Sequence, residues 1–170
     1  VSKNNKTKKM KGTALIIGIL LILGVVSCNS YNGMVTSNNN VDKLWGNVQT
    51  AYQRRADLIG NLVKTVQGAA DFEKGTLTQV IEARASATQI KLDANDLTPE
   101  NMAKFEAAQS QLSGSLSRLM MSVEQYPNLK TNENFMNLQS ELAGTENRIS
   151  VSRNDFNEGV TAFNNQVQSF

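Results

Sequence analysis

Apolar side chains recur at steps of three and four residues along most of the chain, and this spacing restricts the fold to packed helices. The clearest series follows Pro99 and ends at Pro127, and its members form a heptad pattern: Met102, Phe105, Gln109, Leu112, Leu116, Leu119, Val123 and Tyr126. No segment alternates between apolar and polar residues over the length of a strand. We therefore expect an all-α protein without a β-sheet.

Turn signals divide the apolar pattern into four helices. Thr98 is a predicted N-cap, Pro99 fits the first position of a helix, and Pro127 ends that helix. Helices joined by short loops pack antiparallel to their neighbours in sequence. We predict an elongated antiparallel up-down bundle of about four long helices, with Trp45 and Phe72 in its core, over the approximate ranges 41–68, 71–91, 99–126 and 131–170.

A single strongly apolar run precedes these helices. Every residue from Ala14 to Val26 is apolar or glycine, and five lysines stand within the first 11 positions. Extended to about 17 residues, the run would reach roughly 25 Å as a helix, which is short for a bilayer but fits a thinned one. We expect residues 1–30 to form a membrane helix that anchors the bundle of residues 31–170, through the side chains of Ala14, Leu15, Ile16, Ile17, Ile19, Leu20, Leu21, Ile22, Leu23, Val25 and Val26.

Two alternatives to an uncut membrane helix fit the same run. Its length and its lysine-rich front are typical of an export signal, whose apolar part covers about 7–15 residues. The segment "VVSC" ending at Cys28 resembles a bacterial lipobox, which would make Cys28 a lipidated first residue. With an uncut helix or a lipid on Cys28, the lysines stay in the cytoplasm and the bundle faces the outer side of the bacterial membrane.

The composition excludes several kinds of chemistry. The chain has no histidine, which removes Ser-His-Asp and Cys-His catalysis and the commonest metal ligand. It has no glycine-rich phosphate-binding motif, and residues 31–170 are slightly acidic, which argues against a nucleic-acid partner. We expect no catalytic residue, no metal, no cofactor and no small-molecule substrate.

Charged residues interrupt the apolar faces of the first and last predicted helices. Arg55 falls on the apolar face between Ala51 and Leu58, where an unpaired charge would be very costly. We predict that Arg55 pairs with Glu146, within a polar layer of Arg54, Arg55, Asp57, Asn61, Glu146, Asn147 and Arg148. Such a layer sets helix register and partner choice. The alternative is a ligand-binding or catalytic layer inside the bundle.

Four longer segments carry the motifs of a known family. They are "YNGMV" at 31–35, "LWGNVQTAYQRRADLIGNLVKTV" at 44–66, "LMMSVEQYPNLKTNENFMNLQSELAGTENRIS" at 119–150 and "FNEGVTAFNNQVQSF" at 156–170. Together they resemble the bacterial LemA family over nearly all of residues 31–170. The resemblance implies a single-pass, membrane-anchored helical bundle with no firmly assigned enzymatic activity.

The sequence departs from the family pattern at three places. The family usually has a proline where Gly60 stands, and often a histidine where Phe72 stands, so a metal role at that position is implausible here. The family also usually continues past Phe170, so we expect a truncated chain. Together, the residues and the resemblance predict a non-catalytic interaction or scaffold module of the cell envelope, whose partner is another envelope protein or a second copy of the chain.

Overall fold

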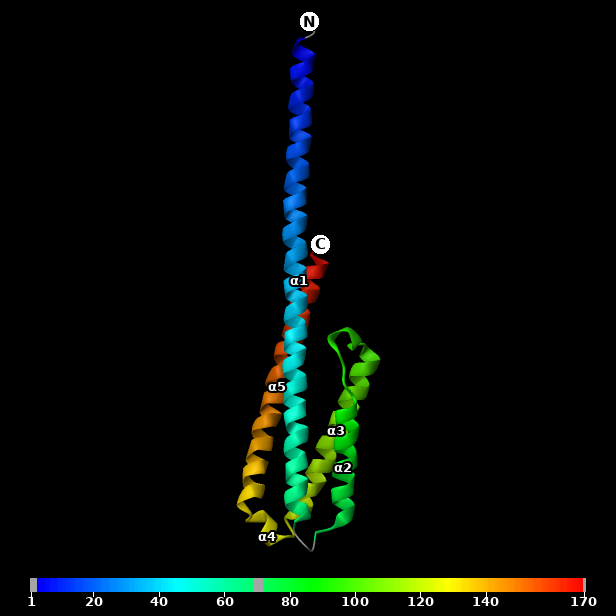
Figure 1. Ribbon diagram of the computed structural model, residues 1–170, viewed down its shortest axis with the longest axis vertical. Helices are drawn as coiled ribbons and strands as arrows, with labels where there is room; N and C mark the ends of the chain where they lie inside the picture. Colours follow the sequence, from blue (N-terminus) through cyan, green and yellow to red (C-terminus); the bar gives the residue numbers. More distant parts are fainter. Residues whose placement is uncertain (1–2, 69–71, 170) are drawn as a thin grey trace. The chain divides into compact units, whose positions relative to one another are not determined.

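The computed structural model describes residues 3–68 and 72–169, except for the side chains of residues 3–16, 19, 26 and 95 (Figure 1). Five α-helices and one short 3₁₀ helix occur in this part of the chain: α1 (Lys3–Gln67), α2 (Lys74–Gln89), η1 (Ala94–Asp96), α3 (Pro99–Val123), α4 (Pro127–Lys130) and α5 (Glu133–Gln168). No β-strand is present among the described residues. The all-α class expected from the sequence is confirmed.

The chain divides into two compact units, Asp42–Glu158 and Val1–Val41 with Gly159–Phe170. In the first unit, α1, α2, α3 and α5 run in alternating directions, as Figure 1 shows from their connections. Buried side chains from all four helices form a shared core, from Ile59 and Leu62 of α1 to Val80, Leu112 and Leu142. This unit is the predicted antiparallel up-down bundle.

The ends of α3 follow the signals in the sequence. The Thr98 hydroxyl oxygen accepts a hydrogen bond from the backbone N–H of Asn101 at 3.2 Å, so Thr98 is the N-cap, and Pro99 is the first helical residue. Helix α3 ends at Val123, three residues before the predicted end, and Pro127 opens α4, a single turn that the sequence pattern did not show. Apolar spacing cannot detect a helix this short, because it needs more than one turn to repeat.

Helix α1 begins much earlier than the predicted first helix of the bundle. It continues without a break through the asparagine-rich segment 29–40 and through Gly60. Asparagine and glycine lower helix propensity by at most about 1 kcal/mol per residue, which a long flanking helix can absorb. Neither the asparagine-rich segment nor Gly60 therefore ends the helix.

The predicted membrane helix is not supported by the described residues. No helix in this part of the chain is both long and apolar enough to cross a bilayer. The apolar run is bounded by lysines before it and by a polar, asparagine-rich segment after it, which limits its length. Of the predicted anchor residues, the side chains of Ala14, Leu15, Ile16, Ile19 and Val26 lie outside the described residues.

We predict that Leu112→Ala lowers the free energy of unfolding by about 2–5 kcal/mol, because Leu112 is fully buried in the core and its truncation leaves a cavity. Met121→Ala on the same helix is the control, since Met121 is 64% exposed and its loss should change stability by about 0.5 kcal/mol or less. Urea unfolding followed by circular dichroism measures both. Equal effects of the two substitutions would contradict the core described above.

Candidate functional site: the buried arginine of α1

Arg55 is the most deeply buried charged residue of the described chain, with 3% of its surface exposed. Its Nη1 donates to Glu146 Oε1 of α5 at 2.8 Å and to the Ser113 hydroxyl of α3 at 2.9 Å. Its Nη2 donates to the Gln109 backbone carbonyl at 3.3 Å and to the Gln109 side-chain oxygen. One guanidinium therefore connects α1 to both α3 and α5.

The remaining surroundings of Arg55 are apolar or aromatic. The guanidinium carbon lies 5.0 Å from the centre of the Tyr52 ring, within the range of a cation–π contact. The Nε atom of Arg55 has no hydrogen-bond partner among the described residues. Nearby, Tyr52, Phe105 and Gln109 line a cavity of about 70 Å³, which has room for water but not for a substrate-sized ligand. The arrangement is suited to holding helices together.

Arg55 separates two apolar clusters along α1. On the N-terminal side of Arg55, one cluster contains Trp45, Val48 and Tyr52 together with Phe105 of α3, and the Trp45 and Phe105 ring centres lie 5.7 Å apart. On the C-terminal side, the buried residues of α1 from Leu58 to Val66 belong to the larger core. Trp45 Nε1 also donates to the Leu92 carbonyl at 2.7 Å, which holds the loop before η1 against α1. Trp45 is 2% exposed and Phe72 is 7% exposed, so both core predictions are confirmed.

The structure brings together only part of the predicted polar layer. Arg55 and Glu146 form the predicted ion pair. Arg54 lies on the surface and pairs with Glu141 at 2.9 Å, while Asp57 lies 3.8 Å from Arg84 Nη2. These exposed pairs contribute little to stability.

The other three predicted members lie on the surface without reaching Arg55. Asn61 and Asp57 line open hollows of about 670 and 450 Å³ on α1. Asn147 and Arg148 of α5 line a separate hollow of about 310 Å³ with Arg54. Only Arg55 and Glu146 of the seven residues therefore pair across the bundle, and the other five lie on its surface, because helical rotation turns sequence neighbours toward different faces.

Sequence reasoning missed two partners of Arg55. Gln109 stands in the apolar series of α3, so its amide was a visible polar interruption of that series. Ser113 gave no signal, because serine is common on exposed helix faces. The structure adds a second, partly buried contact: Arg84 Nε donates to the Ala56 carbonyl at 2.6 Å while its guanidinium lies against Gly60.

The acidic side chains of the described residues are dispersed or paired. No group of three acidic or cysteine side chains in this part of the chain could hold a metal ion. Glu146 and Gln109 are committed to the Arg55 guanidinium. What the buried site can do is fix the register of three helices.

We predict that Arg55→Met and Glu146→Gln are energetically coupled in a double-mutant cycle by about 1–2 kcal/mol, because either single change leaves the other partner incompletely paired. The matched control is Arg54→Met with Glu141→Gln, an equally short pair that is 59% and 51% exposed, with an expected coupling of about 0.5 kcal/mol. Urea denaturation gives the four free energies of each cycle. Absence of coupling for the buried pair would show that the register is set elsewhere.

We also predict that Gly60→Ala stabilises the bundle less than Gly114→Ala. A Cβ at position 60 would lie 3.1 Å from Arg84 Nε and displace it, whereas a Cβ at position 114 meets no atom within 4 Å. The unhindered change should therefore show the full helix-propensity gain of about 1 kcal/mol. Thermal unfolding compares the two variants, and a larger gain at position 60 would contradict the close contact of Arg84.

Comparison with known proteins places these features in a family. The model of the LemA family matches residues 44–170, which is more than half of the chain. "Protein LemA" of Metamycoplasma hominis is 23% identical, over 91% of this chain and 68% of its own length. "Magnetosome protein MamQ 2" of Paramagnetospirillum magneticum is 23% identical over 90% of this chain and 63% of its own length. "Magnetosome protein MamQ" of Magnetospirillum gryphiswaldense is 24% identical over 88% of this chain, and the chain spans 62% of that relative. The chain therefore belongs to the LemA family.

Proposed function

We propose that the chain is a membrane-associated, non-catalytic interaction or scaffold module of the bacterial cell envelope. The observation that carries this proposal is the exposure of apolar side chains on all sides of one part of α1. The consecutive residues Leu20, Leu21, Ile22 and Leu23 are 56–66% exposed, and at about 100° per residue they cover the whole circumference of the helix. A helix that is apolar all round has no face suited to water.

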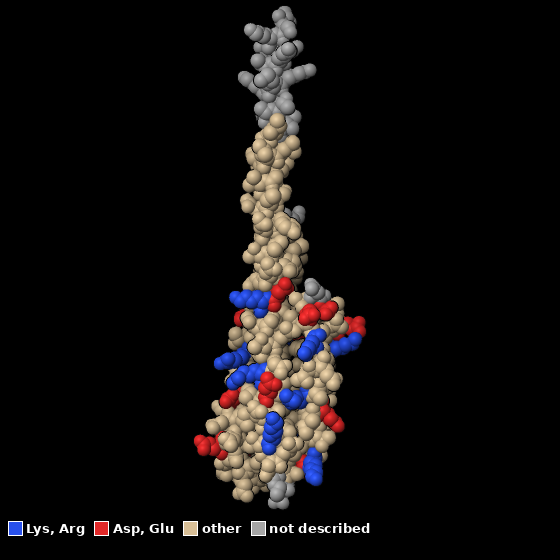
Figure 2. Space-filling model, viewed as in Figure 1, with Lys and Arg blue, Asp and Glu red and all other residues tan. Residues whose placement is uncertain are grey.

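The charge distribution supports membrane association. No charged residue occurs between Lys11 and Asp42. Figure 2 shows the visible face of this stretch free of Lys, Arg, Asp and Glu, whereas both signs of charge are interspersed over the bundle. Exposed apolar surface without charge is unfavourable in water by roughly 25 cal/mol per Å² and favours a lipid environment.

The finer mode of attachment also belongs to this proposal. We propose that the segment inserts into the bacterial membrane with its lysines on the cytoplasmic side and the bundle on the outer side, following the positive-inside rule. Lipidation of Cys28, which is exposed on α1, is the alternative mode. Mass spectrometry of the protein from its native membrane distinguishes them: retained residues 1–27 indicate an inserted helix, and an acylated Cys28 indicates a lipoprotein.

The interaction role rests on how the bundle uses its charges. Its buried arginine is bonded to two neighbouring helices and so helps to maintain the fold. The long α1 and α5 present extended surfaces for helix packing, and the partner would be another envelope protein or a second copy of this chain. Crosslinking in intact membranes followed by purification tests this role, and recovery of uncrosslinked single chains alone would contradict it.

We predict that Leu20→Lys combined with Leu23→Lys releases the protein from lipid vesicles, because transfer of each lysine into the apolar interior of the bilayer costs about 2.5–3.5 kcal/mol. Vesicle flotation measures the bound fraction. The matched control is Met121→Lys on the bundle, where a similarly exposed apolar residue changes to lysine and binding should persist. Flotation of the double variant with the vesicles, or of neither parent nor variant, would contradict membrane association through this segment.

A further inference from the structure

The hollow between α1 and α5 combines positive charge with an apolar floor. It has a volume of about 310 Å³, at the lower end of small-ligand sites, and its walls include Arg54 of α1 and Arg148 of α5. Ala51 and Val151 supply apolar surface to the hollow, and its other lining residues are polar and include Ser152. No acidic side chain lines the hollow. All of these residues lie within the unit Asp42–Glu158.

The two arginines differ in their electrostatic state. Arg54 is neutralised by Glu141, whose carboxylate lies 2.9 Å from its Nη2. Arg148 has no ion-pair or hydrogen-bond partner among the described residues. Within one turn on either side, α5 offers it only Gly144, Thr145, Val151 and Ser152 at helical contact spacing. The hollow therefore carries one uncompensated positive charge.

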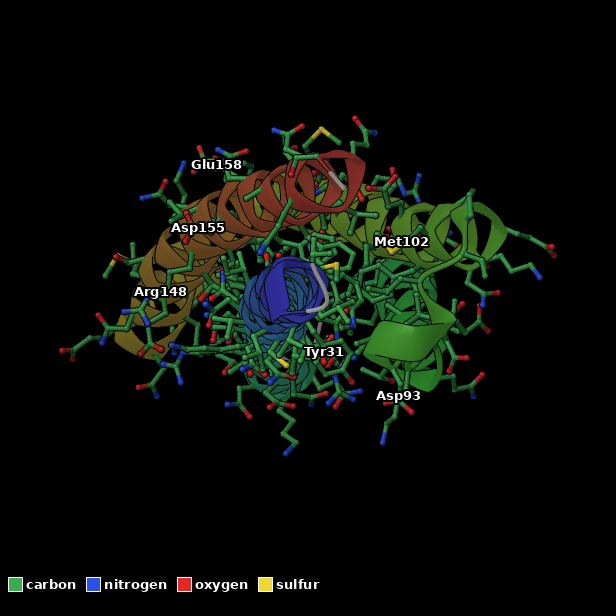
Figure 3. The ribbon with its side chains drawn as sticks, turned by 90° about the horizontal axis from the view of Figure 1, so that it is seen from above. Tyr31, Asp93, Met102, Arg148, Asp155 and Glu158 are labelled. Atoms are coloured by element: carbon green, nitrogen blue, oxygen red, sulfur yellow. The ribbon has the colours of Figure 1, made fainter. Side chains whose placement is uncertain are left out.

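The acidic residues of α5 nearest in sequence are not available to Arg148. Glu146 is directed to Arg55, at 2.8 Å from its Nη1, and Glu141 is held by Arg54. In Figure 3, Arg148 lies on α5 with Asp155 and Glu158 farther along the same helix, and Asp155 is two turns away in sequence. No acidic residue of α5 therefore compensates the charge of Arg148, which is available to an anion.

We propose that this hollow is a binding site for a small monocarboxylate with a short aliphatic part. A guanidinium matches a carboxylate through two parallel N–H···O bonds, and the apolar side chains of the hollow favour a carboxylate that carries an aliphatic part over an inorganic anion. The aliphatic part lies against Ala51 and Val151. This function goes beyond the proposed interaction role and needs neither the membrane nor a protein partner.

The test is a titration of the full chain in non-ionic detergent, followed by the NMR signals of the Val151 methyl groups, which line the hollow. The probes are butyrate, acetate, inorganic phosphate and butylamine, the last having as many carbon atoms as butyrate and the opposite charge. We expect a saturable shift with butyrate and about tenfold weaker binding of acetate, since acetate lacks two methylene groups. Phosphate should bind more weakly than butyrate because it has no aliphatic part, and butylamine should give no saturable shift.

Substitutions locate the binding. Arg148→Gln should weaken butyrate binding at least tenfold, and Arg118→Gln, which removes an exposed arginine of α3 outside the hollow, should leave it unchanged. Thermal unfolding of each variant checks that the bundle is intact. A butyrate affinity unchanged by Arg148→Gln, tighter binding of phosphate or butylamine, or no saturable shift with butyrate would each overturn the proposal. The butyrate titration in detergent does not depend on whether the protein floats with vesicles. Carboxylate binding and membrane association can therefore be disproved independently of each other.

Discussion

The bundle depends on the burial of one guanidinium. Arg55 lies in the interior of α1, and a charge there is tolerated only if its donors are satisfied. Its partners come from α3 and α5 at 2.8–3.3 Å, and a slip of either helix by one turn would move them about 5.4 Å away. The apolar clusters on either side could repack after such a slip, whereas these hydrogen bonds could not. The polar contacts therefore define the register that the apolar contacts then stabilise.

The two apolar clusters connect different parts of the bundle. The larger one joins all four long helices of the bundle through aliphatic side chains such as Ile59 and Leu112. The smaller one is rich in aromatic rings and includes Leu92 of the loop between α2 and α3, whose carbonyl accepts hydrogen bonds from Trp45 and Gln49. A loop that crosses the surface without a sheet or helix needs such partners for its backbone. The aromatic cluster thus holds the loop between α2 and α3 against α1.

Much of the fold could be predicted from local signals, and the limits of those signals are physical. Apolar spacing identified the helices, and Thr98 and Pro99 located the start of α3, because capping and periodicity are properties of nearby residues. The pairing of Arg55 with Glu146 was also accessible, since a charge on an apolar face requires a partner. The contribution of Ser113 was not, because it depends on how α3 is rotated against α1. The predicted single polar layer is divided between the Arg55–Glu146 pair and the surface for the same reason.

The geometry of one turn of α5 links the stability of the bundle to its surface chemistry. Thr145 is buried and faces the core. At about 100° per residue, Glu146 lies about 100° to one side of it and Arg148 about 60° to the other. Glu146 is thereby directed toward Arg55, and Arg148 toward the hollow beside Arg54. Glu146 and Arg148 are therefore about 160° apart around α5, too far apart to pair with each other. Helix geometry alone thus gives one turn of α5 a carboxylate for the interior and an arginine for the surface hollow.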